Sequence, residues 1–396
     1  MTSADERMIG GPVTEAEEEK RTEFIELFFD LVFVFAFTQV TALLLEDTSA
    51  AGFGRAALLF ALVWWAWCAY AWLTDAIDVE NVPTRFVIFA ATLATFFMAL
   101  ALPNAFTDEA GWFVAAYFVV RLLQVALYLW GVRHDPVQLA AVARLTPWFL
   151  VAPSIAVIGG LVDDPARTAL WVASLAIDGI GALFANRSAS GFFVKPAHFA
   201  ERHGLIVIIA LGESIVAIGL GAEGLTENRV YALAVAVSFA GAAAAWWAYF
   251  DFVQIAAEHG LERADADHRG PLARDVYTFF HYPIVLGIIF LAVAAKKTLE
   301  APSEPLSPGG RAALGFGLAL FLLGFVLIRL RVVAAIAWER IGGAATVLVL
   351  VLLLRSVDAL VLLTLAIGVL VAAIAVETFR LREARARFRN DTARQH

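Results

Sequence analysis

The chain has 396 residues, of which 61% are hydrophobic and 12% aromatic. A mean hydropathy of +0.77 excludes an ordinary soluble domain and indicates an all-α, polytopic transmembrane helical bundle. The net charge of −8 is spread over loops and an acidic amino-terminal segment, and its distribution suggests no nucleic-acid partner. Cys68 is the only cysteine, which excludes an intramolecular disulfide and a cysteine-based metal cluster.

The apolar blocks predict about twelve spans, because about 20 apolar residues cross a hydrocarbon core. In the first half the predicted helices lie at 23–45, 54–75, 84–102, 111–131, 140–160 and 167–186. In the second half they lie at 203–222, 229–254, 275–295, 311–330, 334–354 and 356–379. Residues 1–21 are expected to form a disordered acidic tail without a cleavable signal peptide, and residues 380–396 a basic tail.

The distribution of Lys and Arg predicts the orientation. With the amino terminus inside, the cytoplasmic segments hold far more basic residues than the opposite loops. Both termini are therefore expected in the cytoplasm, which requires an even number of spans. The basic tail is expected to meet anionic lipid, so the bilayer is the first predicted partner.

A faint internal repeat supports this count. The stretch from Glu26 aligns with the stretch from Glu201, and both are followed by a helix that ends in aromatic residues and an aspartate. Asp75 then lies near Asp251 in the alignment. We therefore predict two parallel six-helix repeats, at 22–187 and 188–379, related by an axis along the membrane normal.

The first predicted span carries two carboxylates, Glu26 and Asp30, one helical turn apart. Carboxylates inside a span are costly and are functional candidates by default. On a helix they share a face, which is expected to point inward. A cytoplasmic polar cluster, interpreted as a gate, comprises Asp75, Arg85, Glu201, Arg202, His203, Asp251 and Arg274. Within this cluster His203 is interpreted as interfacial rather than catalytic.

Three ionisable residues lie at the middle of their predicted spans: Arg121, Asp178 and Glu213. A guanidinium at the midplane needs a partner, and either carboxylate can supply it. One interpretation is a proton or cation site that Arg121 tunes. The other is a buried ion pair that only fixes helix register.

Glu213 lies in ALGESIVAIGLG, beside Ser214 and among glycines. Glycine either loosens a helix, so that carbonyls reach an ion, or allows tight helix packing around a protonated glutamic acid. His281, in the ninth predicted helix, is a candidate proton relay, or a histidine satisfied by a hydroxyl group.

The stretches ELFFDLVFVFAFTQV and ERHGLIVIIALGESI, together with YTFFHYP around His281, closely resemble the bacterial low temperature requirement A family. The resemblance covers most of the chain, from about Thr22 to the last spans. It implies a multi-span inner-membrane protein linked to growth in the cold, and it supplies no reaction. The residues that it marks are Glu26, Asp30, Glu201, Arg202, Gly204, Gly212, Glu213, Ser214 and His281.

A weaker similarity is to the lysosomal potassium channel family, which has two six-helix repeats. Arg21, Phe29 and Asp30 are in an order comparable to that family's motif, but its Phe-Ser-Asp is missing. In the second repeat Leu205 aligns with Asp30, so the channel is an analogy only.

The sequence contains no HExxH, Walker or Rossmann glycine loop, or GxSxG motif. We therefore expect no metal, no cofactor and no enzymatic activity. The leading hypothesis is a proton- or cation-coupled secondary transporter of an unknown small ion or molecule. The alternatives are a cation channel and a non-transporting stress or lipid-interaction protein, and a homodimer stays open.

Overall fold

The computed structural model describes residues 22–185, 194–222 and 228–380, and within them the regular elements are all helices. The two predicted tails, residues 1–21 and most of 380–396, lie outside the described residues. The first six helices are α1 (Phe24–Glu46), α2 (Ala50–Ala76), α3 (Val82–Ala101), α4 (Ala110–Gly131), α5 (Pro136–Gly160) and α6 (Ala166–Ala185). The predicted all-α class is confirmed.

The second half begins with α7 (Pro196–Gly221) and α8 (Arg229–Ala248). A π-helical turn, η3 (Tyr249–Val253), joins α8 to α9 (Gln254–Arg263), and a second, η4 (Arg274–Phe279), joins α10 (Ala266–Ala273) to α11 (His281–Glu300). The chain ends in α12 (Pro308–Val333), α13 (Trp338–Leu353) and α14 (Ala359–Arg380).

Eleven helical segments of the described chain are long and apolar enough to cross a membrane, which confirms a multi-span protein. α8 and α9 count as one such segment, as do α10 and α11. The predicted eleventh span, 334–354, is the exception, because α13 has only 16 residues. Since a helix rises about 1.5 Å per residue, α13 is about 24 Å long.

The start of α7 differs most from the prediction, since the helix begins at Pro196 rather than at residue 203. Proline suits the first helical position because its missing N–H has no intrahelical partner there. The N–H of Lys195, the N-cap residue, donates to Asp75 Oδ2 over 3.0 Å. A carboxylate from α2 thus stabilises the positive end of the α7 dipole and extends the helix by nearly two turns.

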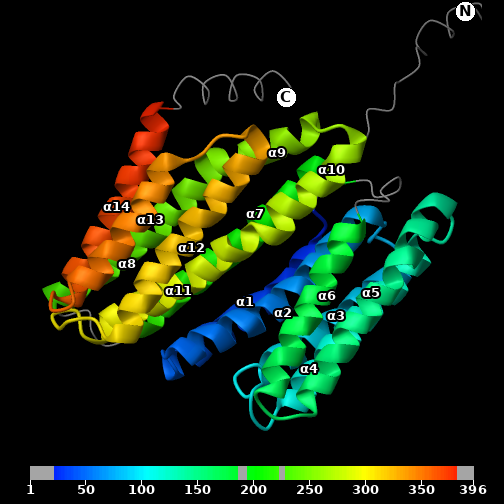
Figure 1. The fold of residues 1–396 in the computed structure, drawn as a ribbon, viewed down its shortest axis with the longest axis horizontal. Coiled ribbons are helices and arrows are strands. Elements are labelled where there is room, and N and C mark those ends of the chain that lie inside the picture. Colours follow the sequence, from blue (N-terminus) through cyan, green and yellow to red (C-terminus); the bar gives the residue numbers. More distant parts are fainter. Residues whose placement is uncertain (1–21, 186–193, 223–227, 381–396) are drawn as a thin grey trace, which may run out of the picture.

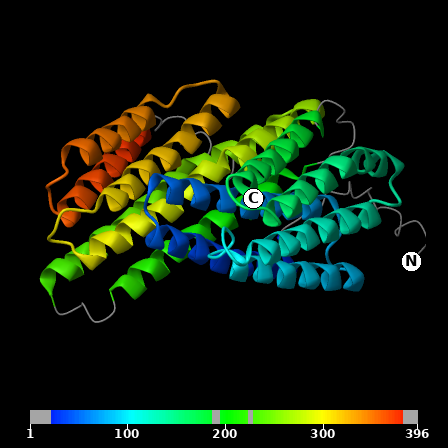
Figure 2. The same cartoon turned by 60° about the horizontal axis from the view of Figure 1, so that its bottom comes forward.

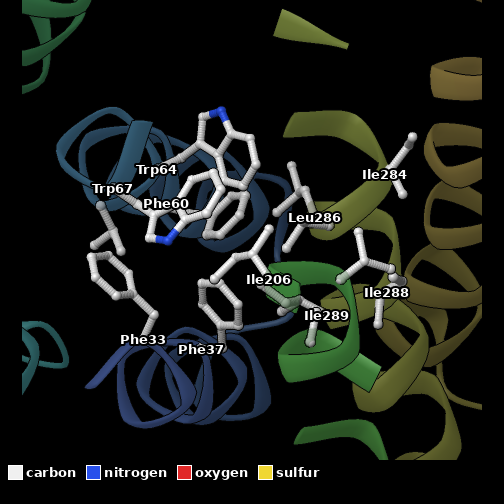
Figure 3. Packing of buried hydrophobic residues seen from close by; sticks show 14 of the residues in the cluster. Phe33, Phe37, Phe60, Trp64, Trp67, Ile206, Ile284, Leu286, Ile288 and Ile289 are labelled. Carbon is white, nitrogen blue, oxygen red and sulfur yellow. The ribbon is translucent and has the colours of Figure 1, made fainter. Parts of the chain in front are cut away.

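The core lies where α1, α2, α7 and α11 meet. Figure 3 shows Phe33 and Phe37 of α1 facing Phe60 of α2 and Ile206 of α7, and all four are fully buried or nearly so. Large apolar side chains on the outer helices are exposed instead, as on lipid-facing surfaces. Burial therefore concentrates the polar side chains of α1, α2 and α7 in the interior.

The helix neighbours of the first half recur in the second. α1 packs on α2 and α3, and α7 likewise packs on α8 and α11. In the first half, α3 packs on α4, α4 on α5 and α5 on α6, and α2 packs on α6. In the second half, α11, α12, α13 and α14 pack on one another in the same sequence, and α8 packs on α14. Figures 1 and 2 show α3 to α6 on one side and α11 to α14 on the other, with α1 begun and α14 ended at the same end of the bundle.

The backbones of helices α11 and α12 come close to each other at two glycines. A Cβ added to Gly287 would lie 2.6 Å from the carbonyl oxygen of Gly317, and one added to Gly317 would lie 3.1 Å from that of Gly287. Small residues permit such backbone contact between membrane helices. The contact fixes the second half's central pair.

Candidate functional site

A buried histidine bridges two carboxylates where α1, α2 and α7 meet. His198 Nδ1 lies 2.9 Å from Asp75 Oδ1, and His198 Nε2 lies 3.1 Å from Glu26 Oε2. All three side chains are 0–1% exposed. A neutral imidazole has a single N–H and a carboxylate only accepts, so both contacts are hydrogen bonds only when the group holds one additional proton.

Arg202 extends this group along α7. Its Nη1 lies 2.9 Å from Glu26 Oε1, and its Nη2 donates to Asp30 Oδ1 over 2.8 Å. Trp67 Nε1 donates to the same oxygen of Asp30 over 2.8 Å. Asp30 Oδ2 is buried and has no hydrogen-bond partner among the described residues. We call Glu26, Asp30, Asp75, His198 and Arg202 the carboxylate cluster.

The local structure of α1 places Glu26 and Asp30 so that both side chains face the cluster. Glu26 closes the capping box of α1, since its carboxylate accepts the N–H of Glu23. Asp30 lies one turn further along the same face, as predicted from the spacing. Three carboxylates face one guanidinium and one imidazole, so the cluster is negative whichever way the imidazole is protonated.

His203 is fully buried among the helices, and its predicted position at the membrane interface stays a prediction. It follows Arg202 on a helix whose inner face is enclosed by aromatic rings: the ring centroid of Trp67 lies 4.8 Å away and that of Tyr277 4.8 Å. Its Nδ1 donates to the carbonyl of Phe199, and its Nε2 has no partner among the described residues.

His281 lies beside it, with 5.4 Å between the two ring centroids. His281 Nδ1 donates to Val276 O, so Nε2 accepts from the Tyr249 hydroxyl over 2.8 Å. The hydroxyl partner that one interpretation expected is thus present.

The pairing of Arg121 is settled by geometry: its Nη2 donates to Asp178 Oδ1 over 2.9 Å, with both side chains 1% exposed. The pair adjoins a cavity of about 80 Å³ between α2, α4, α5 and α6. Arg274 of η4 reaches the same cavity, whose wall is otherwise mostly aromatic and aliphatic: Trp65, Trp72, Tyr128, Phe149 and Leu145.

Glu213 does not join this pair. Its Oε2 lies 2.5 Å from Thr38 Oγ1 of α1, and Thr38 Oγ1 also lies 3.0 Å from Val34 O. A hydroxyl has one hydrogen, so both contacts are satisfied at once when Glu213 is a carboxylic acid that donates to Thr38. Ser214 is buried and donates back to Ala210 O.

The glycines near Glu213 do not loosen α7, which is continuous to Gly221. Gly212 and Gly219 have open space where a Cβ would lie, so they form no tight helix contact either. Only Gly221 lies near a neighbour, Leu299 of α11, at 3.2 Å from a built Cβ. Neither interpretation of Gly212 and Gly219 is borne out.

The remaining predicted cluster residues lie apart from the carboxylate cluster. Arg85 and Glu201 are exposed, and Glu201 Oε2 accepts the N–H and hydroxyl of Thr22. Arg274 pairs with Asp275 over 2.5 Å, and Asp251 is half-buried on η3. Of the residues in the predicted gate, Asp75, Arg202 and His203 are the buried ones and lie on α7 or against it, and the gate itself stays a prediction.

Two functional candidates were missed by the sequence interpretation. His198 preceded the predicted start of the seventh span, although Pro196 just before it was a signal for a helix start. The buried pair Arg340–Glu377, 2.5 Å apart between α13 and α14, gave no local signal. Among residues 22–185, 194–222 and 228–380, no group of three His, Cys, Asp or Glu is arranged to hold a metal ion.

Comparisons with known proteins agree with this membrane architecture. Residues 21–375 match the family described as bacterial low temperature requirement A protein. An uncharacterised protein of Rhizobium meliloti (strain 1021) is 32% identical over 298 residues, which cover 73% of this chain and 72% of the relative. No solved structure matches.

Proposed function

The chain belongs to the bacterial low temperature requirement A family, and from this premise we propose that it is a proton-coupled secondary transporter of a small molecule or ion in the bacterial inner membrane. The observation that carries the proposal is the bridge of His198 between Glu26 and Asp75, buried where the ends of α1, α2 and α7 meet.

The bridge is a proton-binding site by its chemistry. It holds its two hydrogen bonds only with one proton more than a neutral imidazole and two carboxylates possess. Loss of that proton leaves a carboxylate facing an imidazole lone pair in a dry interior, where an unmade hydrogen bond costs about 1–3 kcal/mol or more. Protonation therefore holds α1 and α2 against α7, and deprotonation favours their separation.

The position of the bridge suits coupling. It joins helices of the first half, α1 and α2, to α7 of the second half. Contacts Thr22–Glu201, Asp30–Arg202 and Thr38–Glu213 occur in the same order along α1 and α7, so these helices run parallel. Matching neighbours in both halves support two parallel six-helix repeats, whose rocking about such an interface gives alternating access.

The cavity beside Arg121 and Asp178 is the proposed entry point of the co-transported solute. Its volume, about 80 Å³, is small, as expected for a closed state of the pathway. Arg121 Nε is buried without a hydrogen-bond partner among the described residues, and Gln124 Oε1 is likewise unpartnered. These two groups are available to a polar solute.

The test measures charge movement in reconstituted vesicles adsorbed on a solid-supported electrode. A rapid pH jump displaces charge when a buried site binds protons, even before a co-substrate is known. Wild type and His134→Gln, a control at an exposed histidine, are expected to give transient currents. His198→Gln, checked for folding by size-exclusion chromatography, is expected to lose most of the current.

Two outcomes would reject the proposal: no pH-jump current in wild type, or a full current in His198→Gln. Vesicles loaded with a pH-sensitive dye then identify the solute, since only a coupled solute gradient moves protons. Single-channel conductance in planar bilayers would instead favour the cation channel. If no gradient moved protons or ions, and if deletion of the gene altered the phospholipid composition of the cells, the lipid-interaction protein would be favoured.

A further inference from the structure

A second cavity, of about 470 Å³, is lined by residues between Val253 and Glu377 of the second half and plays no part in the proposed function. Helices α9, α12, α13 and α14 enclose it at the end of the bundle where α14 ends, as Figure 1 shows for those helices. Its volume lies within the range of ligand sites. The charged side chains in its wall are Arg263, Arg329, Arg331, Arg340 and Glu377.

Four arginines and one glutamate line this cavity, so its wall holds more cationic than anionic side chains. Arg340 donates to Glu377, and Arg329 Nη1 lies 2.5 Å from Glu339 Oε1. Arg331 Nε lies 2.8 Å from Asp275 Oδ2. Glu339 also pairs with Arg380, and Asp275 also pairs with Arg274. Five guanidinium groups therefore share three carboxylates. Arg263 also lines the cavity.

One guanidinium is not fully satisfied. Arg340 is 2% exposed, and its Nε and Nη2 both donate to Glu377 Oε2. Its Nη1 is buried and has no hydrogen-bond partner among the described residues. The ring of Phe325 holds the guanidinium in place, with the guanidinium carbon 4.2 Å from the ring centroid. A buried unpaired donor costs free energy, which an acceptor atom in the cavity would recover.

Apart from His259, the rest of the wall is apolar. Val253, Ala256 and Ala257 contribute from η3 and α9, and Ile328 and Val332 from α12. Val333, at the end of α12, is 55% exposed, so the apolar wall continues onto the outer surface of the helix. The cavity thus combines an anion-attracting part with a hydrocarbon-lined part.

We propose that this cavity, the arginine cavity, binds an anionic amphiphile: a phosphate group held by Arg263, Arg331 and Arg340, with an apolar stem along α9 and α12. Guanidinium groups recognise phosphate oxygens through charge-assisted, often bidentate hydrogen bonds. Basic pockets between membrane helices recognise phospholipid headgroups by this chemistry. The phosphate comes either from a membrane phospholipid or from a soluble organic phosphate, and the experiment separates these sources.

In the lipid arm, the full-length protein is released from nanodiscs that contain phosphatidylglycerol or only phosphatidylcholine, and native mass spectrometry counts retained lipids. In the soluble arm, glycerol 3-phosphate is titrated in phosphatidylcholine vesicles and the thermal midpoint is recorded. The double variant Arg263→Gln/Arg331→Gln removes two wall charges without breaking the buried Arg340–Glu377 pair. Arg355→Gln, an exposed arginine outside the cavity, is the matched control.

Wild type and Arg355→Gln are expected to retain phosphatidylglycerol, or to be stabilised by glycerol 3-phosphate, while the double variant loses about tenfold or more in affinity. Ala256→Phe, which fills the apolar part without changing charge, is expected to weaken binding as well. Absence of anion preference in wild type, or unchanged binding in both variants, would overturn the proposal. Retention in the lipid arm alone assigns the phospholipid as the source.

Discussion

His198 shows how a single residue changes the interpretation of a site. The sequence identified Glu26 in the first predicted span and assigned Asp75 and Arg202 to a cytoplasmic polar cluster. It could not place them around an imidazole, because His198 lay outside the predicted seventh span. The contact depends on where α7 begins, and the Asp75 carboxylate that caps Lys195 sets that start.

The buried pair Arg121–Asp178 permits a test of its two interpretations. Arg121→Leu leaves Asp178 as a lone buried charge and is expected to cost about 3–5 kcal/mol of stability. Arg121→Leu/Asp178→Leu removes both charges and is expected to recover most of that loss. Chemical denaturation of the purified variants in detergent, followed by circular dichroism, measures both changes.

Transport then separates structure from function. If the double variant is stable but moves no solute in vesicles, the pair is part of the solute site. Normal transport in the stable double variant would show that the pair serves only to fix helix register.

At the scale of elements, hydropathy located the helices but not their irregularities. The predicted spans 229–254 and 275–295 correspond to longer helices that contain the π-helical turns η3 and η4. π-helical turns are frequent at functional sites, and these two supply Tyr249 and Val276, the partners of His281. No apolar period distinguishes such a turn from an ordinary helix, so sequence could not predict it.

Two helical glycines give opposite predictions for one substitution. Gly287→Ala places a Cβ 2.6 Å from Gly317 O and is expected to destabilise the α11–α12 contact by about 1–3 kcal/mol. Gly212→Ala meets open space and is expected to be neutral or to stabilise α7 by up to about 1 kcal/mol. Thermal midpoints of the two purified variants measure the difference, and equal midpoints would contradict the close helix contact.

The start of α5 is expected to respond to acid. Asp135, its N-cap, has a pKa lowered from 3.8, chiefly because it accepts the backbone N–H of Gln138. A carboxylate whose pKa is lower in the folded than in the unfolded chain stabilises the fold at pH values above its pKa in the unfolded chain. This stabilisation is lost as the pH falls through its pKa in the folded chain. The thermal midpoint of Asp135→Ala is therefore expected to be lower than that of wild type at about pH 6, and the difference is expected to be smaller at about pH 3.

Asp135→Asn keeps an acceptor at both pH values and is the control. A gap between Asp135→Ala and wild type that stays constant with pH would show that the carboxylate charge does not stabilise the cap.

For the whole molecule, the all-helical class and the presence of many spans were predictable because both depend on local hydropathy, whereas eleven rather than twelve segments meet the length for a span in the described chain. The contacts between halves were not, since they depend on which faces of α1, α2 and α7 meet. Arg121 illustrates the limit: depth within the membrane left two carboxylates as partners, and only the packing of α4 on its neighbours selected Asp178. The repeat and the orientation stay predictions.

The orientation can be measured with single cysteines in a Cys68→Ala background. Asp78, between α2 and α3, and Asp108, between α3 and α4, are both exposed and lie in successive loops. With the amino terminus in the cytoplasm, a membrane-impermeant maleimide is expected to label Asp108→Cys in intact spheroplasts and Asp78→Cys only in inverted vesicles. The reverse pattern would show that the amino terminus lies outside.

The short helix α13 has a consequence for the surrounding lipid. At about 24 Å it is shorter than the hydrocarbon thickness of about 30 Å, and tilting would only increase this hydrophobic mismatch. Its residues Val349, Leu352 and Leu353 are strongly exposed, so lipid chains would have to adapt to α13 if it crosses the bilayer. Local thinning of the bilayer costs a fraction of a kcal/mol per Å. Shorter acyl chains would remove that cost, so the protein is expected to be more stable in a thinner bilayer.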